Sequence, residues 1–344
     1  QRLTGVQDDL GNTITYTLDD AGNTTKTEYK DATPALKYTQ SQMYDELSRL
    51  IKDINATSDE SIYAYDKNSN LTSFIDANTN TTGYSYDALQ RLVKETDALS
   101  GETDQTYNTL NDNTQTIDAR DNTTQYTYNA FGQVSEEVSP DRGYSSYVYD
   151  LGGNIILRDT AVGTVADYTY DALNRVIAIN YLLDTSENAT YTYDSCTNGA
   201  GHVCSVTDAS GTTAYAYDLL GRVTTVTETR GALTFTTGYA YDLAGVLTGV
   251  TLPSGRTVTY ALNGNAEVTG VTAPVAGTPV SLAGSIGYLP FGPATSMTYG
   301  NALGFTAAYD QNYWPTSRAV GGIFSNAYTT DDNGNICLLY TSAA

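Results

Sequence analysis

The sequence contains very few of the residues on which enzymes and metal sites depend. Its 344 residues include 1 His, 3 Cys and 1 Trp. A general base needs a partner within hydrogen-bonding reach, and a tetrahedral zinc site needs four ligands. Because His202 has no nucleophile motif near it, we expect it to be a surface loop residue. We therefore predict that the chain is not an enzyme and has no catalytic residue, no metal site and no cofactor.

Positive charge and long apolar runs are also scarce. Lys and Arg total 17 against 39 Asp and Glu, which gives a net charge of −22. Because clustered cations hold phosphate groups, this balance argues against nucleic acid or an anionic membrane as a partner, and it favours solubility. The longest uncharged stretch, 268–309, is broken throughout by Gly, Pro, Ser and Thr. The sequence therefore predicts no membrane span and no signal peptide.

Tyrosine, in contrast, is present in excess, with 30 Tyr against 6 Phe. From Tyr44 to Tyr170, seven Tyr residues are each 21 positions apart, and an Asp or Asn follows every one. The spacing then loosens to 23 and 24 residues at Tyr193, Tyr217 and Tyr241. We predict a structural role for the whole motif, which comprises Tyr44, Asp45, Tyr65, Asp66, Tyr86, Asp87, Tyr107, Asn108, Tyr128, Asn129, Tyr149, Asp150, Tyr170, Asp171, Tyr193, Asp194, Tyr217, Asp218, Tyr241 and Asp242.

Each copy of the motif predicts a β-hairpin. A second Tyr commonly lies two residues before the motif Tyr, which places both rings on one face of a strand. The Asp or Asn is typical of the first position of a turn. Three residues later, Gly132, Gly153 or Asn174 fits a left-handed residue that closes the loop. An aliphatic residue opens the next strand, and segments such as "DANTN" (76–80) form a second turn.

A single repeat cannot fold alone. Ordering its 21 residues costs roughly 30 kcal/mol, and its two Tyr and few aliphatic side chains bury about half of the apolar area that would offset this cost. Neighbouring hairpins must therefore pair edge to edge. We predict an all-β fold in which tandem hairpins form one continuous coiled sheet, the wall of a partial β-shell. The Tyr rows either pack within this wall or line a surface that holds an unfolded guest or sugar rings.

The repeat array is expected to span residues 1–336. Its period is regular over about 44–176, and the chain becomes looser and rich in Gly, Ala and Pro after about residue 264. The last residues, "CLLYTSAA" (337–344), abandon the pattern and are expected to be a tail foreign to the natural protein. The chain also begins in mid-motif, since "QRLTGV" matches "QRLVKE" at 90–95. We interpret it as a fragment of a longer protein.

Several segments resemble the Tyr-Asp repeat of Rhs and YD-repeat proteins, namely "YDALQRL", "YDALNRV", "YDLLGRV", "YDLAGVL", the cysteine-bearing segment 193–211 and "YLPFGPATSMTYGNAL" at 288–303. In that family the repeats form a hollow β-shell around a variable C-terminal toxin, as in bacterial polymorphic toxins and insecticidal toxin complexes. Teneurins use a similar shell in adhesion. The resemblance implies a structural shell segment of a large bacterial protein, secreted or at the cell surface. Its partner would be the rest of its own chain, including a C-terminal effector.

Two rival functions stay open. The first is an adhesin that binds cell-surface glycans through its Tyr-rich face. The second is a self-cleaving peptidase that uses pairs of Asp, although the "DPxG" core segment usual in the bacterial family is absent and no toxin domain follows. An isolated segment would expose unpaired strand edges, so we expect oligomers in solution.

Cys196 and Cys204 flank the hairpin-like loop "TNGAGHV". A disulfide across this loop has suitable geometry and is expected if the protein is exported. Zinc would need two further ligands, and Cys337 receives no role. The segments "DDAGN" (19–23) and "DDNGN" (331–335) are similar to calcium loops but lack the spaced ligands and the closing Glu of an EF-hand.

Overall fold

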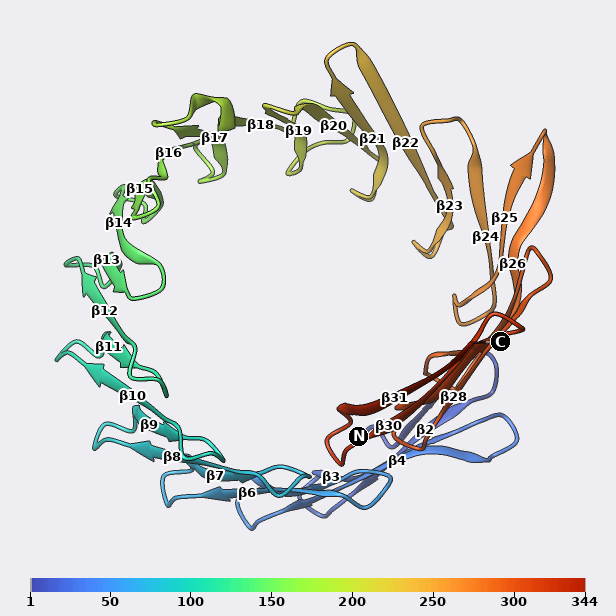
Figure 1. Ribbon diagram of the computed structural model, residues 1–344, viewed down its shortest axis with the longest axis horizontal. Coiled ribbons are helices and arrows are strands. Elements are labelled where there is room, and N and C mark those ends of the chain that lie inside the picture. Colours follow the sequence, from blue (N-terminus) through green and yellow to red (C-terminus); the bar gives the residue numbers. More distant parts are fainter. Residues whose placement is uncertain (1, 344) are drawn as a thin grey trace. The chain divides into compact units, whose positions relative to one another are not determined.

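The computed structural model describes residues 2–343 (Figure 1). Within these residues the only regular element that is not a β-strand is η1, a 3-10 helix at Thr185–Glu187. The chain divides into two compact units. The first unit comprises residues 1–84, 241–249 and 257–344, and the second comprises 85–240 and 250–256. The prediction of an all-β fold is confirmed.

The strands follow one another along the chain with short turns between them. Those up to residue 86 are β1 (Gly5–Gln7), β2 (Thr13–Leu18), β3 (Thr24–Lys30), β4 (Leu36–Tyr44), β5 (Leu50–Ile54), β6 (Glu60–Tyr65), β7 (Leu71–Ile75) and β8 (Thr81–Tyr86). The next are β9 (Leu92–Thr96), β10 (Glu102–Tyr107), β11 (Asn113–Ile117), β12 (Thr123–Tyr128), β13 (Val134–Ser139), β14 (Gly143–Tyr149), β15 (Ile155–Thr160) and β16 (Val165–Tyr170).

The remaining strands continue the series to the end of the described chain. They are β17 (Val176–Tyr181), β18 (Ala189–Tyr193), β19 (Val203–Asp208), β20 (Gly211–Tyr217), β21 (Val223–Arg230), β22 (Leu233–Tyr241), β23 (Leu247–Thr251) and β24 (Thr257–Leu262). The last seven are β25 (Val268–Val275), β26 (Thr278–Tyr288), β27 (Ala294–Tyr299), β28 (Gly304–Tyr309), β29 (Pro315–Val320), β30 (Phe324–Thr330) and β31 (Ile336–Ala343). Most of residues 337–344, expected to be a tail outside the repeats, thus lie in β31, which pairs with β30.

Consecutive strands within each unit pair in antiparallel fashion, as the repeat predicts. The pairing of β14 with β15 shows the register: Val148 faces Leu157, and Tyr149 then faces Ile155, so the register shifts by one residue. The same shift precedes the motif Tyr in β6, β10, β12 and β16. The motif Tyr of these strands therefore lies at a β-bulge, where the strand twists into its turn.

The turn after the motif Tyr is a three-residue hairpin loop, except after Tyr193, where a longer loop joins Asp194 to His202. In the turn 150–154, the backbone N–H of Asp150 donates to the carbonyl of Asn154 (2.9 Å), and the N–H of Gly153 donates to the carbonyl of Asp150 (3.2 Å). Gly153 has a φ of 88°, and the equivalent Ser48 and Asn174 each have a φ of 60°. A left-handed residue closes the loop at this position, as predicted. We call these five-residue segments YD turns, and the turns between repeats linking turns.

The sheet has no conventional core. In the part of the chain whose side chains are described, the buried apolar residues are Ala166, Cys204, Tyr217, Ala273, Ala307 and Val320, and no large side chain is fully buried. The other motif Tyr residues and the aliphatic residues that open the strands are instead half-buried. The fold is therefore stabilised repeat by repeat, through ladder hydrogen bonds and contacts between neighbouring hairpins.

The first unit brings together segments that are far apart in the sequence. Turns from its two ends bond to one another, in the region where β2, β4, β28 and β30 overlap in Figure 1. Asn265 bonds to Asp8, and Ala56 bonds to Asn312; these pairs are separated by 257 and 256 residues. YD turns of the C-terminal part thus meet linking turns of the N-terminal part.

Candidate functional site

The motif Asp organises its own turn. In Asp150, Oδ1 accepts hydrogen bonds from the backbone N–H groups of Gly152 (2.8 Å) and Asn154 (2.9 Å), and Oδ2 accepts from Nδ2 of Asn154 (2.9 Å). These bonds from Asn154 lower the pKa of Asp150. Asp45, Asp66, Asp87, Asp171 and Asp218 use Oδ1 in the same way. The carboxylate is therefore occupied by the turn that it closes.

Two repeats carry Asn in this position and preserve the geometry. Oδ1 of Asn108 accepts from the N–H groups of Leu110 (2.8 Å) and Asp112 (3.0 Å), and its Nδ2 donates to Oδ2 of Asp112 (2.9 Å). Asn129 makes the matching bond to Oε1 of Gln133 (2.8 Å). The turn needs an acceptor at its first position and a complementary side chain four residues later, and it does not need a charge there.

The motif Tyr joins one repeat to the next. The hydroxyl of Tyr149 donates to the backbone carbonyl of Val134 (2.7 Å), the residue that opens the second strand of the preceding repeat. Tyr65, Tyr107, Tyr128 and Tyr170 make the same bond to the residue 15 positions earlier. Phe would fill the same space but could not make this bond, which explains why the repeats use Tyr.

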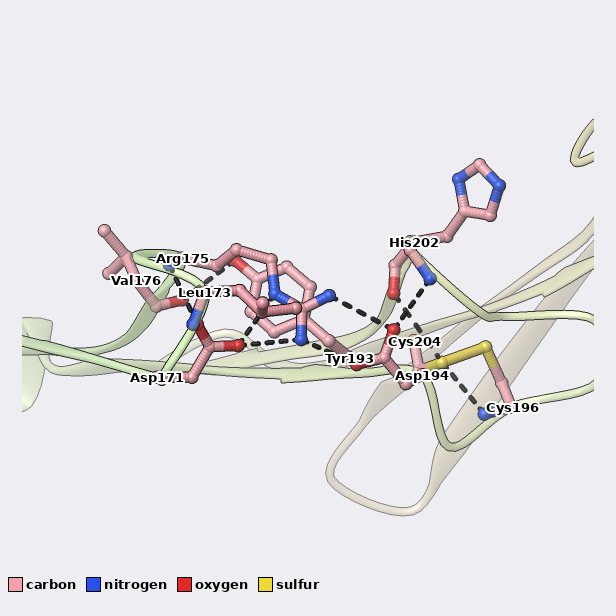
Figure 2. Close-up of polar contacts among 10 residues, drawn as sticks. Asp171, Leu173, Arg175, Val176, Tyr193, Asp194, Cys196, His202 and Cys204 are labelled. Carbon is pink, nitrogen blue, oxygen red and sulfur yellow. Dashed lines mark hydrogen bonds and ion pairs between the residues drawn. A yellow bond between two sulfur atoms is a disulfide. The ribbon is translucent and has the colours of Figure 1, made fainter.

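Some repeats add an Arg clamp, which Figure 2 shows at Arg175. Its Nε donates to Oδ2 of Asp171 (2.7 Å), and its two terminal nitrogens reach Asp194 of the next repeat at 3.1 and 2.6 Å. The guanidinium carbon lies 4.3 Å from the centre of the Tyr193 ring, whose hydroxyl donates to the carbonyl of Val176 (2.8 Å). One side chain thus contacts three motif residues.

The stacking recurs at Arg49 over Tyr65 and at Arg91 over Tyr107, at 4.8 and 4.6 Å from the ring centres. There the Arg donates to the backbone carbonyl of the next motif Asp or Asn instead of to a carboxylate. Charge-assisted bonds to a carboxylate and stacking on an aromatic face suit Arg better than Lys. At Asp194, the hydrogen bond from Arg175 and a second from the backbone of Gly201 lower the pKa to about 2. The clamp therefore keeps this carboxyl ionised in any but strongly acidic conditions.

The cysteine loop follows directly on this clamp. Cys196 and Cys204 form a disulfide with their Cα atoms 5.3 Å apart. A Cβ at Gly199 would collide with the sulfur of Cys196, so a larger residue would not fit there. His202, expected to be a surface loop residue, is half-exposed, and its ring stacks on Tyr217 at 4.5 Å. The loop thus packs against the next motif.

Through these contacts the motif residues close their own turns and bond one repeat of the sheet to the next. Within residues 2–343, His, Cys, Asp and Glu nowhere gather in a group of three or more that could hold a metal ion. No helix in the described part of the chain has the length and apolar character needed to cross a membrane. The chemistry that the repeated site offers is turn closure, bonding between repeats and ion pairing.

The sequence and the structure can now be compared with known proteins. A profile of the family described as RHS Repeat matches residues 65–102 and 198–233, which include the YD turns at 66–70, 87–91 and 218–222. These two segments of the chain are RHS repeats. Among curated proteins, no sequence matches it.

The fold of the chain is similar to that of solved Tc toxin structures. The crystal structure of TcdB2-TccC3-TEV matches with a TM-score of 0.81 and 17% identity, over 97% of this chain and 20% of that chain. The structure of the Photorhabdus luminescens Tc holotoxin pore matches with a TM-score of 0.80 and 17% identity, again over 97% and 20% of the two chains. At this identity the likeness shows the fold. The chain spans about a fifth of the length of the chains that it matches.

Replacing Asp by Asn should have different effects in the two kinds of YD turn. In Asp150→Asn, the amide of Asn154 can rotate, together with that of Asn174 to which it is bonded, so that its oxygen accepts from the new NH₂ group, as Gln133 already does for Asn129. In Asp171→Asn, Arg175 has only donors, so it loses the carboxylate of its own turn and keeps only that of Asp194. We expect no measurable change in the thermal midpoint for Asp150→Asn, and a decrease of about 3 °C for Asp171→Asn. Equal decreases would contradict this assignment.

Acid should destabilise the sheet. The pKa values of Asp66, Asp87, Asp150 and Asp171 are lowered from 3.8 by the bonds within their turns. Because the folded pKa lies below the unfolded pKa, these groups contribute their full stabilisation above about pH 4 and lose it as the pH falls further. In about 0.5 M salt, which screens the net charge, the thermal midpoint should stay level from about pH 7 to 5 and decrease below about pH 4. A midpoint that rises on acidification would contradict the role of these carboxylates.

Proposed function

We propose that this RHS-repeat chain is a segment of a protein shell that encloses a C-terminal effector in a large exported bacterial protein. The observation that carries the proposal is its fold likeness to TcdB2-TccC3, with a TM-score of 0.81 over 96% of this chain. A wall of this kind needs no catalytic group. Its repeated side chains need only bond one hairpin to the next, which is what the motif Tyr and Asp do.

The single-layer construction supports the same role. A sheet without a covering layer leaves two faces, and its residues are stabilised by neighbouring repeats rather than by a core. Such a sheet can be extended by adding repeats, and it can hold a guest on one face without rearranging a core. In the proposal, secretion or display at the cell surface follows from the fold likeness to a toxin complex, and the disulfide at Cys196 suits an oxidising compartment.

Protease protection tests the proposal. The gene that encodes this sequence is expressed with the coding sequence that follows it, and the downstream domain is also made alone. We expect the downstream domain to be digested at least about tenfold more slowly within the whole protein, because an enclosed chain must first be exposed for cleavage. A variant in which several clamp Arg residues are replaced together should restore rapid digestion of the downstream domain. Equal digestion of the free and the attached domain would contradict enclosure.

Glycan binding by the Tyr rows is the alternative function. The hydroxyls of Tyr65, Tyr107 and Tyr149 donate to backbone carbonyls of the neighbouring repeat, so they are not available as donors to a ligand. We therefore favour the shell over the adhesin. Specific binding of the chain to a glycan array, lost when exposed Tyr residues are replaced, would reverse this preference.

A further inference from the structure

The third residue of a YD turn contacts the neighbouring stretch of sheet in the first unit. In the turn 310–314 this residue is Asn312: its Oδ1 accepts from the N–H of Ala56 (2.7 Å), and its Nδ2 donates to Oγ1 of Thr57 (2.8 Å). In the turn 263–267, Oδ1 of Asn265 accepts from the N–H of Asp9 (3.2 Å), and its Nδ2 donates to Oδ2 of Asp8 (2.7 Å). The position is therefore one at which a YD turn docks onto a linking turn.

Two further YD turns extend the series. Asn333 accepts from the N–H of Ala77 (3.0 Å) and donates to Oδ2 of Asp76 (2.7 Å). In the turn 289–293 the third residue is Phe291, whose ring lies 5.6 Å from that of Tyr29. An apolar side chain can thus take the docking position as well as Asn can. In this contact Phe291 is 39% exposed.

The second unit carries an uncovered row of apolar residues at this same position. They are Leu89, Leu110, Phe131, Leu173 and Leu220, with exposures of 67%, 72%, 83%, 70% and 72%. Each backbone N–H is fixed by Oδ1 of its motif Asp or Asn, for example Leu173 by Asp171 at 2.8 Å (Figure 2). A rigid row of exposed apolar side chains along one edge is typical of an interaction surface.

The linking turns of the second unit form the complementary edge. They also present exposed apolar residues, at Leu99 (93%), Val162 (84%) and Leu183 (71%). In the first unit, linking turns are the surface onto which YD turns dock. Because both kinds of turn recur with the repeat, the spacing along one edge matches the spacing along the other.

We propose that the chain associates with a second copy of itself through the second unit, with the YD-turn row of one copy docked on the linking-turn edge of the other. The dimer then still offers one free edge of each kind, the linking-turn edge of one copy and the YD-turn row of the other. The contact is therefore head-to-tail, and assemblies grow beyond the dimer as the concentration rises. Since each copy has a net charge of −22, the copies repel one another, and added salt should strengthen the association.

Sedimentation velocity on the whole chain tests this inference. From about 1 to 100 μM, and more strongly in about 0.5 M than in 0.05 M salt, we expect the weight-average mass to rise above that of the dimer. The variant Leu89→Ser, Leu110→Ser, Phe131→Ser, Leu173→Ser should raise the dissociation constant by more than about tenfold. Its thermal midpoint verifies that it still folds, because these side chains contribute little to the sheet.

A matched control distinguishes association through the YD-turn row from association through the faces of the sheet. Val138→Thr, Val148→Thr, Ile156→Thr removes apolar surface from β13, β14 and β15, where these residues are 46%, 47% and 37% exposed. We expect this control to associate like the unchanged chain. A monomer at every concentration and salt would overturn the proposal. Undiminished association of the Ser variant would also overturn the proposal, because the association would then be due to open strand edges. Neither outcome affects the proposal that the shell encloses a C-terminal effector, which the protease experiment tests separately.

Discussion

Tyr149→Ala lowers the local free energy of unfolding of β13–β16 by about 2–3 kcal/mol, less than for a fully buried aromatic because Tyr149 is half-buried. The substitution removes ring contacts on the sheet and the hydroxyl bond to the carbonyl of Val134 (2.7 Å). Burial also raises the pKa of Tyr149, which agrees with a hydroxyl held out of water. Tyr149→Phe retains the ring and should lose only about 1 kcal/mol.

Hydrogen exchange measured by mass spectrometry is the suitable readout, because repeat arrays unfold in parts. The amides of β13–β16 should exchange about 30–150 times faster in Tyr149→Ala, and those of β28–β30 should be unchanged. Tyr144→Ala is the control on the same strand: its side chain is 42% exposed, and its hydroxyl bonds to the side chain of Glu136 rather than to a backbone carbonyl of the preceding repeat. If the two Ala variants exchange alike, the motif Tyr has no special role between repeats.

Breaking the disulfide should lower the local free energy of unfolding by nearly as much as Tyr149→Ala does. Cys196 and Cys204 are 8 residues apart, and loss of a cross-link over so short a loop removes about 2.5 kcal/mol of stability by the loop-entropy estimate. Cys204 is only 4% exposed, so its replacement by Ala also leaves unfilled space. The double variant Cys196→Ala, Cys204→Ala should therefore unfold locally at β18–β20 before the rest of the second unit.

The measurement compares thermal unfolding and hydrogen exchange with and without a thiol reductant. The reductant should lower the midpoint of the unchanged chain and leave that of the double variant in place. Cys337→Ala is the control, because Cys337 is free and exposed and should not change the response to reductant. An unchanged chain with the same midpoint in both conditions would show that the disulfide does not stabilise the loop.

Local features of the fold could be predicted from the sequence because each depends on neighbouring residues. Asp150 and Gly153 specify their turn through a side-chain bond and a left-handed φ of 88°. The spacing of the Tyr residues specifies strands that pair in sequence order. These features need no knowledge of distant parts of the chain.

Contacts between repeats were harder to predict. Arg175 spans two YD turns. A signal for this was present, since Arg follows the motif Asp by four residues in "YDALQR", "YDALNR" and "YDLLGR". The reach of its side chain to Asp194 depends on the lateral spacing of strands, which the sequence pattern alone does not specify.

The docking of Asn312 and Asn333 onto linking turns had no local signal. These partners are separated by 255–257 residues, and their meeting depends on small twists that accumulate over many strands. His202 is a similar case, because its stacking on Tyr217 depends on the path of the cysteine loop. Whether residues 337–344 belong to the natural protein stays a prediction.

Pulsed electron spin distance measurements within the second unit test most directly the claim that successive hairpins pair edge to edge. Nitroxide labels are placed in pairs at exposed YD-turn residues: Leu89 with Leu110, with Phe131 and with Leu173. Each repeat adds two strands at about 4.8 Å each, so the account predicts distances that increase by about 10 Å for each repeat between the labels. Distances that do not increase in sequence order, as in separately folded repeats or helices, would contradict it.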